Sequence, residues 1–273
     1  MTGPAVVFRT FELSDARFDG GGLRCITVKS PALAQRADIT FYVPVAARGR
    51  TDVPLVILLH GVYGSHWAWA LRGGAHRTLD RLQREEELPP FVLAMPSDGL
   101  WGDGSGYLPQ RTQDFERWIV SEVPAAVAQA VPEVTAESPR FIAGLSMGGF
   151  GALRLAGKYP GRFRAASGHS SLTEFVQLRA FVEESLGTFT ALDEDRSVLD
   201  VLLRNRSRLP ALRFDCGTSD PLLPANRALH AALVEAGIAH DYEEFAGGHE
   251  WTYWEAHLAD TLRFFAHTLN LTP

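Results

Sequence analysis

The chain has 273 residues, 46% of them hydrophobic and 21% charged, which is typical of a globular protein and excludes a disordered, collagen-like or coiled-coil chain. A formal net charge of −6 gives no electrostatic reason to bind nucleic acid or an anionic membrane, so a small molecule is the expected partner. The length favours one α/β domain over residues 1–273 rather than two small domains.

The cysteine count and the distribution of apolar residues indicate the compartment in which the protein works. Cys25 and Cys216 are the only cysteines, which excludes a disulfide framework and indicates a reducing compartment. The start of the chain lacks the basic residues and long apolar core of a signal peptide. No later run approaches the ~20 apolar residues of a membrane span. We therefore expect a soluble, cytoplasmic protein without a membrane partner; a homo-oligomer stays open.

Short apolar, β-branched segments alternate with helical patterns along most of the chain. The first strand-like segments, 6–10, 25–29 and 38–43, are joined by turns too short for a crossover helix, which predicts an antiparallel edge. Parallel strands are predicted at 55–59, 91–95, 141–143, 165–167, 212–216 and 240–245. The fold class is therefore α/β: a mostly parallel central sheet with antiparallel N-terminal edge strands and helices on both faces. Residues 172–209 carry two helix-like stretches without a strand, and we interpret them as a small cap segment.

The motif Gly144-Leu145-Ser146-Met147-Gly148 follows one of these strands and opens a helix. A serine on such a sharp turn is strained, and neighbouring glycines let the turn close and the helix approach the sheet. The helix N-terminus then points at any oxyanion formed beside the serine. A bare G-x-S-x-G also occurs by chance, but the strand and helix around it favour Ser146 as a nucleophile.

A serine hydroxyl needs a base, which in an α/β-hydrolase follows in the order Ser, acid, His. His249 lies in the loop between the last predicted strand and the last helical pattern, where it can reach the top of the sheet. The remaining histidines in the last third of the chain lie in helical patterns or start a strand: His230, His240, His257 and His267. Asp220, after the preceding strand, is the predicted acid, with Asp215 inside that strand as the alternative. Asp220 could instead only start an Asx turn before Pro221.

The oxyanion of an acyl-transfer intermediate needs backbone N–H donors. One should come from Met147, and the second from the loop after residues 55–59, with Val62 first and Tyr63 next. His60 in this loop is interpreted as structural.

Candidate substrate contacts come from aromatic residues near these loops. Trp101 and Tyr107 flank a glycine-rich loop that lacks the Gly-Lys-Ser/Thr ending of a phosphate loop, which favours a pocket wall over a nucleotide site. Trp67 follows the oxyanion loop and lines the pocket or packs in the core. The side chain of His169 either faces the site or forms its hydrogen bonds with nearby backbone groups.

Five segments together resemble a known family: 59–64, 95–99, 144–153, 217–220 and 248–251, spanning about residues 55 to 270. The chain resembles the esterase family of α/β-hydrolases that includes esterase D, also called S-formylglutathione hydrolase, and the mycolyltransferases. The resemblance implies a serine esterase that needs no metal or other cofactor, with Ser146, Asp220 and His249 as the triad and Val62 and Met147 as oxyanion donors. Esterase D usually has a longer aromatic stretch where this chain has 101–107, and mycolyltransferases are exported, so glutathione thioesters are one option among several.

We therefore expect a serine carboxylesterase that hydrolyses small carboxylic esters or thioesters through an acyl-enzyme on Ser146. Acyl transfer to an alcohol uses the same groups and differs in whether water is excluded. A non-catalytic binding protein of the same fold is the third reading, although no triad residue is lost.

Overall fold

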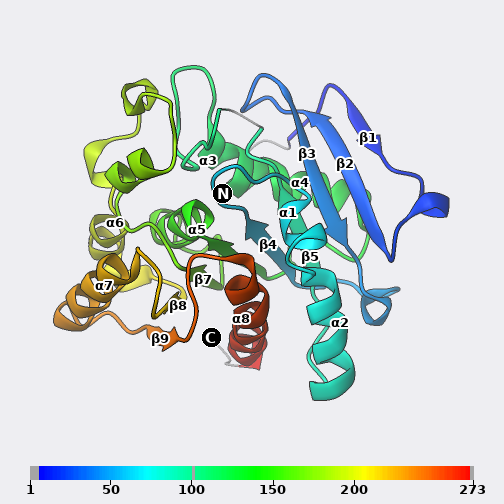
Figure 1. Ribbon diagram of the computed structural model, residues 1–273. Coiled ribbons are helices and arrows are strands. Elements are labelled where there is room, and N and C mark those ends of the chain that lie inside the picture. The colour runs from blue at the N-terminus through cyan, green and yellow to red at the C-terminus, as the bar shows by residue number, and fades with distance from the viewer. Residues whose placement is uncertain (1–5, 100–101, 271–273) are drawn as a thin grey trace.

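One nine-stranded sheet runs through the computed structural model, which describes residues 6–99 and 102–270 (Figure 1). The strand order is β1-β2-β3-β5-β4-β6-β7-β8-β9. The strands are β1 (Phe11–Leu13), β2 (Leu23–Lys29), β3 (Arg36–Tyr42), β4 (Leu55–Leu59), β5 (Val92–Pro96), β6 (Arg140–Leu145), β7 (Ala165–His169), β8 (Ala211–Gly217) and β9 (Asp241–Phe245). Pairing is antiparallel from β1 to β5 and parallel from β5 to β9, so the predicted fold class is confirmed.

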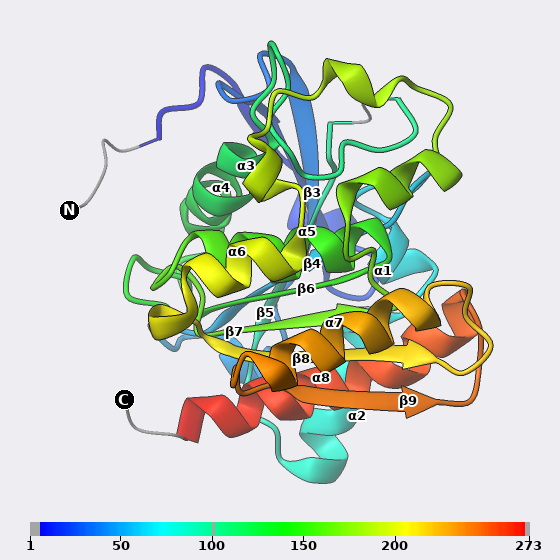
Figure 2. The same ribbon diagram turned by 90° about the vertical axis from the view of Figure 1, so that its left-hand side faces the viewer.

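Helices cover both faces of this sheet (Figure 2). The α-helices are α1 (Ala68–Leu71), α2 (Ala75–Glu86), α3 (Phe115–Arg117), α4 (Val123–Ala130), α5 (Met147–Lys158), α6 (Val198–Arg204), α7 (Leu223–Glu235) and α8 (Trp251–Asn270). A π-helical turn, η3 (Trp118–Glu122), joins α3 to α4. Helices α3 to α7 lie over one face, while α2 and α8 lie over the other. In the part of the chain that the structure describes, no helix is long and apolar enough to cross a membrane.

The alternation of side chains along β4 separates two hydrophobic cores. Ile57 belongs to the core with α4, α5 and α7, whereas its neighbours Val56 and Leu58 belong to the core with α2 and α8. Every residue of β4 is buried, as expected for a central parallel strand covered on both faces. This is why its sequence is an unbroken apolar run.

The predicted strand at 6–10 is wrong. The edge strand begins at Phe11 and pairs only with residues 26–28 of β2. Beyond Lys29 the chain turns, and Ser30 directs its backbone N–H to Gln35 and its hydroxyl to Glu122. Residues before Thr10 therefore meet no strand to pair with, and an apolar segment without a ladder partner does not form a strand.

The carboxyl ends of the parallel strands meet at one edge of the sheet. In the β6–β7–β8 register, Leu145 lies opposite His169, and His169 lies opposite Asp215. The backbone N–H of Ser146 donates to the carbonyl oxygen of His169 at 2.8 Å. The loops after β6, β8 and β9 therefore leave the sheet side by side.

The cap segment, residues 172–209, contains three 3-10 turns and α6 before a last turn, and no named strand. Its C-terminal part packs closely on α5. A Cβ atom at Gly157 of α5 would lie only 2.7 Å from the Leu202 side chain of α6.

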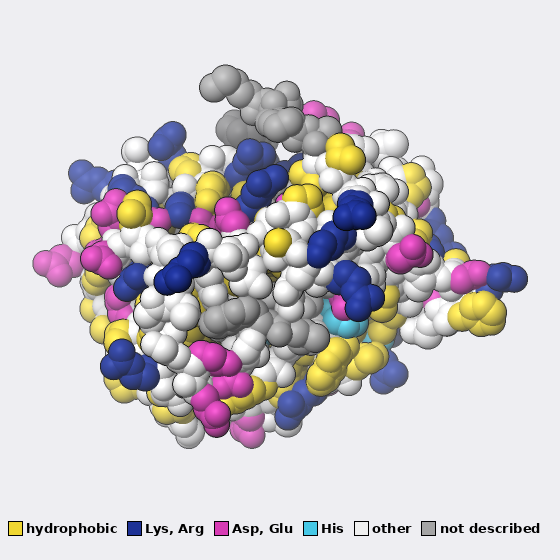
Figure 3. Space-filling view, turned by 90° about the horizontal axis from the view of Figure 1, so that it is seen from above, with side chains coloured by type: hydrophobic (Ala, Val, Ile, Leu, Met, Phe, Trp, Pro, Cys, Tyr) yellow, Lys and Arg dark blue, Asp and Glu magenta, His cyan; other side chains and the backbone are white. Residues whose placement is uncertain are grey.

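The surface seen from above carries Lys and Arg side chains interspersed with Asp and Glu side chains, and no charge of one sign dominates it (Figure 3).

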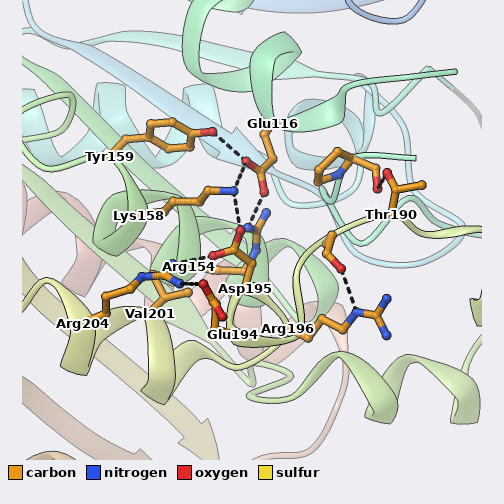
Figure 4. A network of polar contacts seen from close by, with 12 residues as sticks. Glu116, Arg154, Lys158, Tyr159, Thr190, Glu194, Asp195, Arg196, Val201 and Arg204 are labelled. Carbon is orange, nitrogen blue, oxygen red and sulfur yellow. Dashed lines mark hydrogen bonds and ion pairs between the residues drawn. The ribbon is translucent and has the colours of Figure 1, made fainter. Parts of the chain in front are cut away.

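A buried ionic network ties α3, α5 and the cap segment together (Figure 4). The Glu116 carboxylate accepts from the fully buried Arg154 at 2.5 Å, from Lys158 at 2.7 Å and from the Tyr159 hydroxyl at 2.7 Å. Lys158 also contacts Asp195 at 2.7 Å. The charge on Arg154 is thus compensated mainly by Glu116.

Replacing Glu116 with glutamine should lower the free energy of unfolding by about 3–5 kcal/mol, because a buried guanidinium loses its carboxylate. Urea unfolding of the wild type and the variant measures this change. The matched control is Glu194→Gln, whose carboxylate lies 3.3 Å from Arg204 but is 63% exposed. Its expected cost is below about 1 kcal/mol. Equal costs for the two variants would contradict a structural role of the network.

Candidate active site

Ser146 stands on the turn between β6 and α5 with φ 53° and ψ −118°, a conformation that side-chain-bearing residues rarely adopt. The turn closes because two glycines touch: a Cβ atom at Gly144 would lie 2.3 Å from the carbonyl carbon of Gly148. A Cβ atom at Gly148 would in turn lie 2.3 Å from the carbonyl oxygen of Leu59. The glycines of the motif are therefore required by close backbone approach, and the turn presents Ser146 at the carboxyl edge of the sheet.

Ser146, His249 and Asp220 form a chain of hydrogen bonds. His249 Nδ1 donates to Asp220 Oδ2 at 2.9 Å, and the Ser146 hydroxyl lies 3.0 Å from His249 Nε2. An ionised carboxylate only accepts, so it holds the imidazole in the tautomer whose Nε2 lone pair faces the serine. This geometry is that of a nucleophile, a base and an orienting acid.

The environment keeps Asp220 ionised. Burial alone would raise the pKa of its carboxyl, but the hydrogen bonds from His249 and from the Leu222 backbone N–H outweigh it and lower that pKa. The Leu222 bond, at 2.8 Å to Oδ1, also fixes the carboxylate. The Asx-type turn and the contact with His249 therefore occur together at Asp220.

Asp215 belongs to a separate buried network. Its carboxylate lies 2.9 Å from His169 Nδ1, accepts from the Tyr253 hydroxyl at 2.9 Å and pairs with Arg213. Burial opposes ionisation, yet His169 and Arg213 lower the pKa of Asp215 to about 2. These side-chain partners differ from those of Asp220, so Asp220, and not Asp215, contacts His249.

The loop after β4 passes directly beside Ser146. A Cβ atom at Gly61 would lie 2.7 Å from the Leu145 side chain and 3.4 Å from Ser146 Cβ. The backbone N–H of Tyr63 donates to Asp103, whereas that of Val62 has no acceptor within the described residues. Met147 is the first residue of α5, where backbone N–H groups lack a partner in the helix. Val62 rather than Tyr63 therefore has a free donor to join that of Met147.

A pocket of about 360 Å³ opens over Ser146, and we call it the reaction pocket. Val62, the predicted contact Trp67, and His249 are among its lining residues, and Trp67 is 40% exposed. The lining residues that the sequence interpretation missed include Arg72, Phe181, Trp251 and Trp254. The Phe181 ring, from the cap segment, stacks on His249 at 5.7 Å, and Trp254 meets His249 edge to face at 5.0 Å. The spacing of Trp251 and Trp254, one turn apart at the start of the last helix, was the available signal.

Two predicted substrate contacts lie elsewhere, and this part of the prediction is corrected. Tyr107 is fully buried, and its hydroxyl donates to the His60 carbonyl at 2.9 Å, so it packs behind the loop after β4. His169 is fully buried between Asp215 and Thr261, whose hydroxyl lies 3.0 Å from Nε2. Neither lines the reaction pocket. The remaining predicted contact, Trp101, lies outside the described residues.

His60 is held in a structural contact. Its Nε2 accepts from the Asp98 backbone N–H at 3.2 Å, which leaves Nδ1 to donate to the Gly61 carbonyl at 2.7 Å. Both ring nitrogens therefore hold the loop after β4 in place. Among residues 6–99 and 102–270, no group of three or more His, Cys, Asp or Glu side chains is arranged to hold a metal ion.

Comparison with known proteins agrees with this geometry. The chain is 27% identical to an acetyl esterase of Caldicellulosiruptor saccharolyticus over 234 residues, covering 79% of this chain and 84% of that protein. A ferulic acid esterase structure superposes with a TM-score of 0.78 at 24% identity, covering 90% of this chain and 98% of the other. An S-formylglutathione hydrolase from Agrobacterium tumefaciens gives a TM-score of 0.75 at 19% identity, covering 97% and 100%. The two structures support the α/β-hydrolase fold. Because the Putative esterase family model matches residues 30–265, the chain belongs to that family of serine hydrolases.

Proposed function

We propose that the protein is a serine carboxylesterase that works through an acyl-enzyme on Ser146. The observation that carries the proposal is the unbroken hydrogen-bond chain from Ser146 through His249 to Asp220, with donor distances of 3.0 and 2.9 Å. A complete relay of this kind activates a hydroxyl that is otherwise a weak nucleophile. It also argues against a non-catalytic binding protein.

The reaction follows from the positions of the groups. Ser146 Oγ attacks the carbonyl carbon of the ester while His249 Nε2 takes the hydroxyl proton, and Asp220 stabilises the imidazolium. The oxyanion that forms accepts hydrogen bonds from the Val62 and Met147 N–H groups, each worth about 3–4 kcal/mol in the transition state. The intermediate collapses, and His249 returns the proton to the departing alcohol or thiol. Water then attacks the acyl-enzyme by the same steps and releases the acid.

Hydrolysis is favoured over acyl transfer by access to the base. The His249 side chain is 19% exposed, so solvent water reaches the imidazole that must deprotonate it. Transfer to an alcohol would need a site that excludes water from the acyl-enzyme.

The pocket suits a compact ester. Its volume of about 360 Å³ and its aromatic walls at Trp67, Phe181 and Trp254 accommodate a short acyl or aryl group. The acetyl esterase and the ferulic acid esterase that the chain resembles are named for such groups. Rates with short acyl esters, aryl esters, sugar acetates and S-formylglutathione would rank the substrates.

Labelling with a fluorophosphonate probe tests the proposed nucleophile. The probe phosphonylates an activated serine, so tandem mass spectrometry should find the adduct on Ser146. Labelling should be lost in Ser146→Ala and strongly slowed in His249→Ala, since the base is then missing. An adduct on another serine, or equal labelling of the wild type and Ser146→Ala, would refute the proposal.

A further inference from the structure

A second pocket, larger than the reaction pocket, lies along α2, from the residues before its first turn to Arg84 in its last turn. It encloses about 560 Å³, and we call it the α2 pocket. Figure 1 shows α2 in cyan, beside α8 in red. The side chains that define its chemistry are Arg72, His76, Arg77, Arg81, Arg84 and Glu255. Arg72 also lines the reaction pocket, so the two pockets adjoin.

Arginine side chains outnumber carboxylates in the lining of this pocket, although the whole chain carries a net charge of −6. Within the described residues, Arg77 and Arg84 form no ion pair, and Arg72 contacts only the face of Trp251, at 5.6 Å. Arg81 contacts Glu85 at 3.5 Å, a long surface pair of small energetic value. Four guanidinium groups therefore share a cavity with the single carboxylate of Glu255.

The backbone adds to this positive field. Helix α2 has 12 residues, and its N-cap is Gly74, which offers no side chain to accept from the first backbone N–H groups. Gly74 and Thr78 both line the pocket, so the positive end of the helix dipole faces it.

His76 lies in the wall of the pocket beside these groups. Its side chain is only 8% exposed and lines the pocket, and its Nδ1 atom is buried without a hydrogen-bond partner in the part of the chain that the structure describes. An imidazole can donate to an anion whether it is charged or neutral.

We propose that the α2 pocket binds a phosphate-type anion, held by Arg77 and Arg81 with His76 and the first turn of α2. Guanidinium groups bind phosphate oxygens through paired hydrogen bonds, and a helix N-terminus adds backbone donors. Because Arg72 joins the two pockets, the anion can be a free ion or a phosphate group on the ester bound at Ser146. The second of these sources rests on the proposed function, while the first does not.

Binding of inorganic phosphate to the Ser146→Ala protein tests the site independently of catalysis. Calorimetric titration at constant ionic strength should give saturable binding. The double variant Arg77→Gln/Arg81→Gln should weaken that binding about tenfold or more, since hydrogen bonds between charged groups are lost. The matched control is Arg206→Gln/Arg208→Gln, which removes the same charge at an exposed turn, η7 (Arg206–Arg208), and should bind like the parent. Absence of saturable binding, or equal weakening by both double variants, would overturn the proposal.

Turnover distinguishes the two sources of the anion. If the phosphate belongs to the substrate, Arg77→Gln/Arg81→Gln should lower kcat/KM for 2-acetoxyethyl phosphate about tenfold and leave that for the neutral 2-hydroxyethyl acetate unchanged. If the anion is free, the variant should lose phosphate binding while the ratio of the two kcat/KM values stays as in the wild type. If neither ester is hydrolysed by the wild type although phosphate binds, the proposed function fails and the anion site stands.

Discussion

Replacing Ser146 with alanine should lower kcat for p-nitrophenyl acetate by at least about 10⁴-fold, because no acyl-enzyme can form. The side chain removed is one hydroxyl that donates to His249 at 3.0 Å, so we expect the fold to be unaffected. Steady-state kinetics and the unfolding midpoint of the same preparation measure the two effects separately.

The hydrogen-bond chain of Ser146, His249 and Asp220 also predicts that these residues act as one catalytic unit. His249→Ala should cost nearly as much as Ser146→Ala, and the double variant should be no slower than the single ones, because the residual rate then comes from the oxyanion donors and binding alone. Ser207→Ala, at an exposed serine of η7, is the matched control and should keep the wild-type rate. Losses that multiply in the double variant, or a Ser146→Ala enzyme with the wild-type rate, would contradict the mechanism.

Replacing Asp220 with asparagine should lower kcat by about 10⁴-fold with little loss of stability. The amide keeps the size of the side chain but removes the charge that stabilises the imidazolium and can hold His249 in the wrong tautomer. Kinetics at saturating substrate measure the loss.

Asp215→Asn is the matched comparison, since it makes the same chemical change five positions away. It leaves the buried Arg213 and His169 without their carboxylate, so we expect a loss of about 3–5 kcal/mol in the free energy of unfolding. The folded fraction should keep most of its turnover, because Asp215 does not touch His249. If Asp215→Asn abolished turnover in the folded state and Asp220→Asn did not, the roles of the two carboxylates would have to be exchanged.

Local patterns in the sequence predicted much of the fold. The apolar run at Leu55–Leu59 and the strand, turn and helix around Ser146 predict their elements because backbone conformation there follows from periodicity and glycine placement. The same local patterns gave a wrong strand at residues 6–10. Those residues have the composition of a strand, but a strand forms only where a neighbouring strand can pair with it.

The sequence alone predicted the residues of the candidate site: a serine at a strand-to-helix turn, with an acid and a histidine on later loops in hydrolase order. The contacts that favour Asp220 over Asp215 and Val62 over Tyr63 could be seen only in the folded chain, because they depend on which donors and acceptors are already occupied. Contacts between distant segments likewise buried Tyr107 and brought Phe181 onto His249. Local spacing specifies backbone conformation, whereas the direction and partners of a side chain are set by packing across the fold.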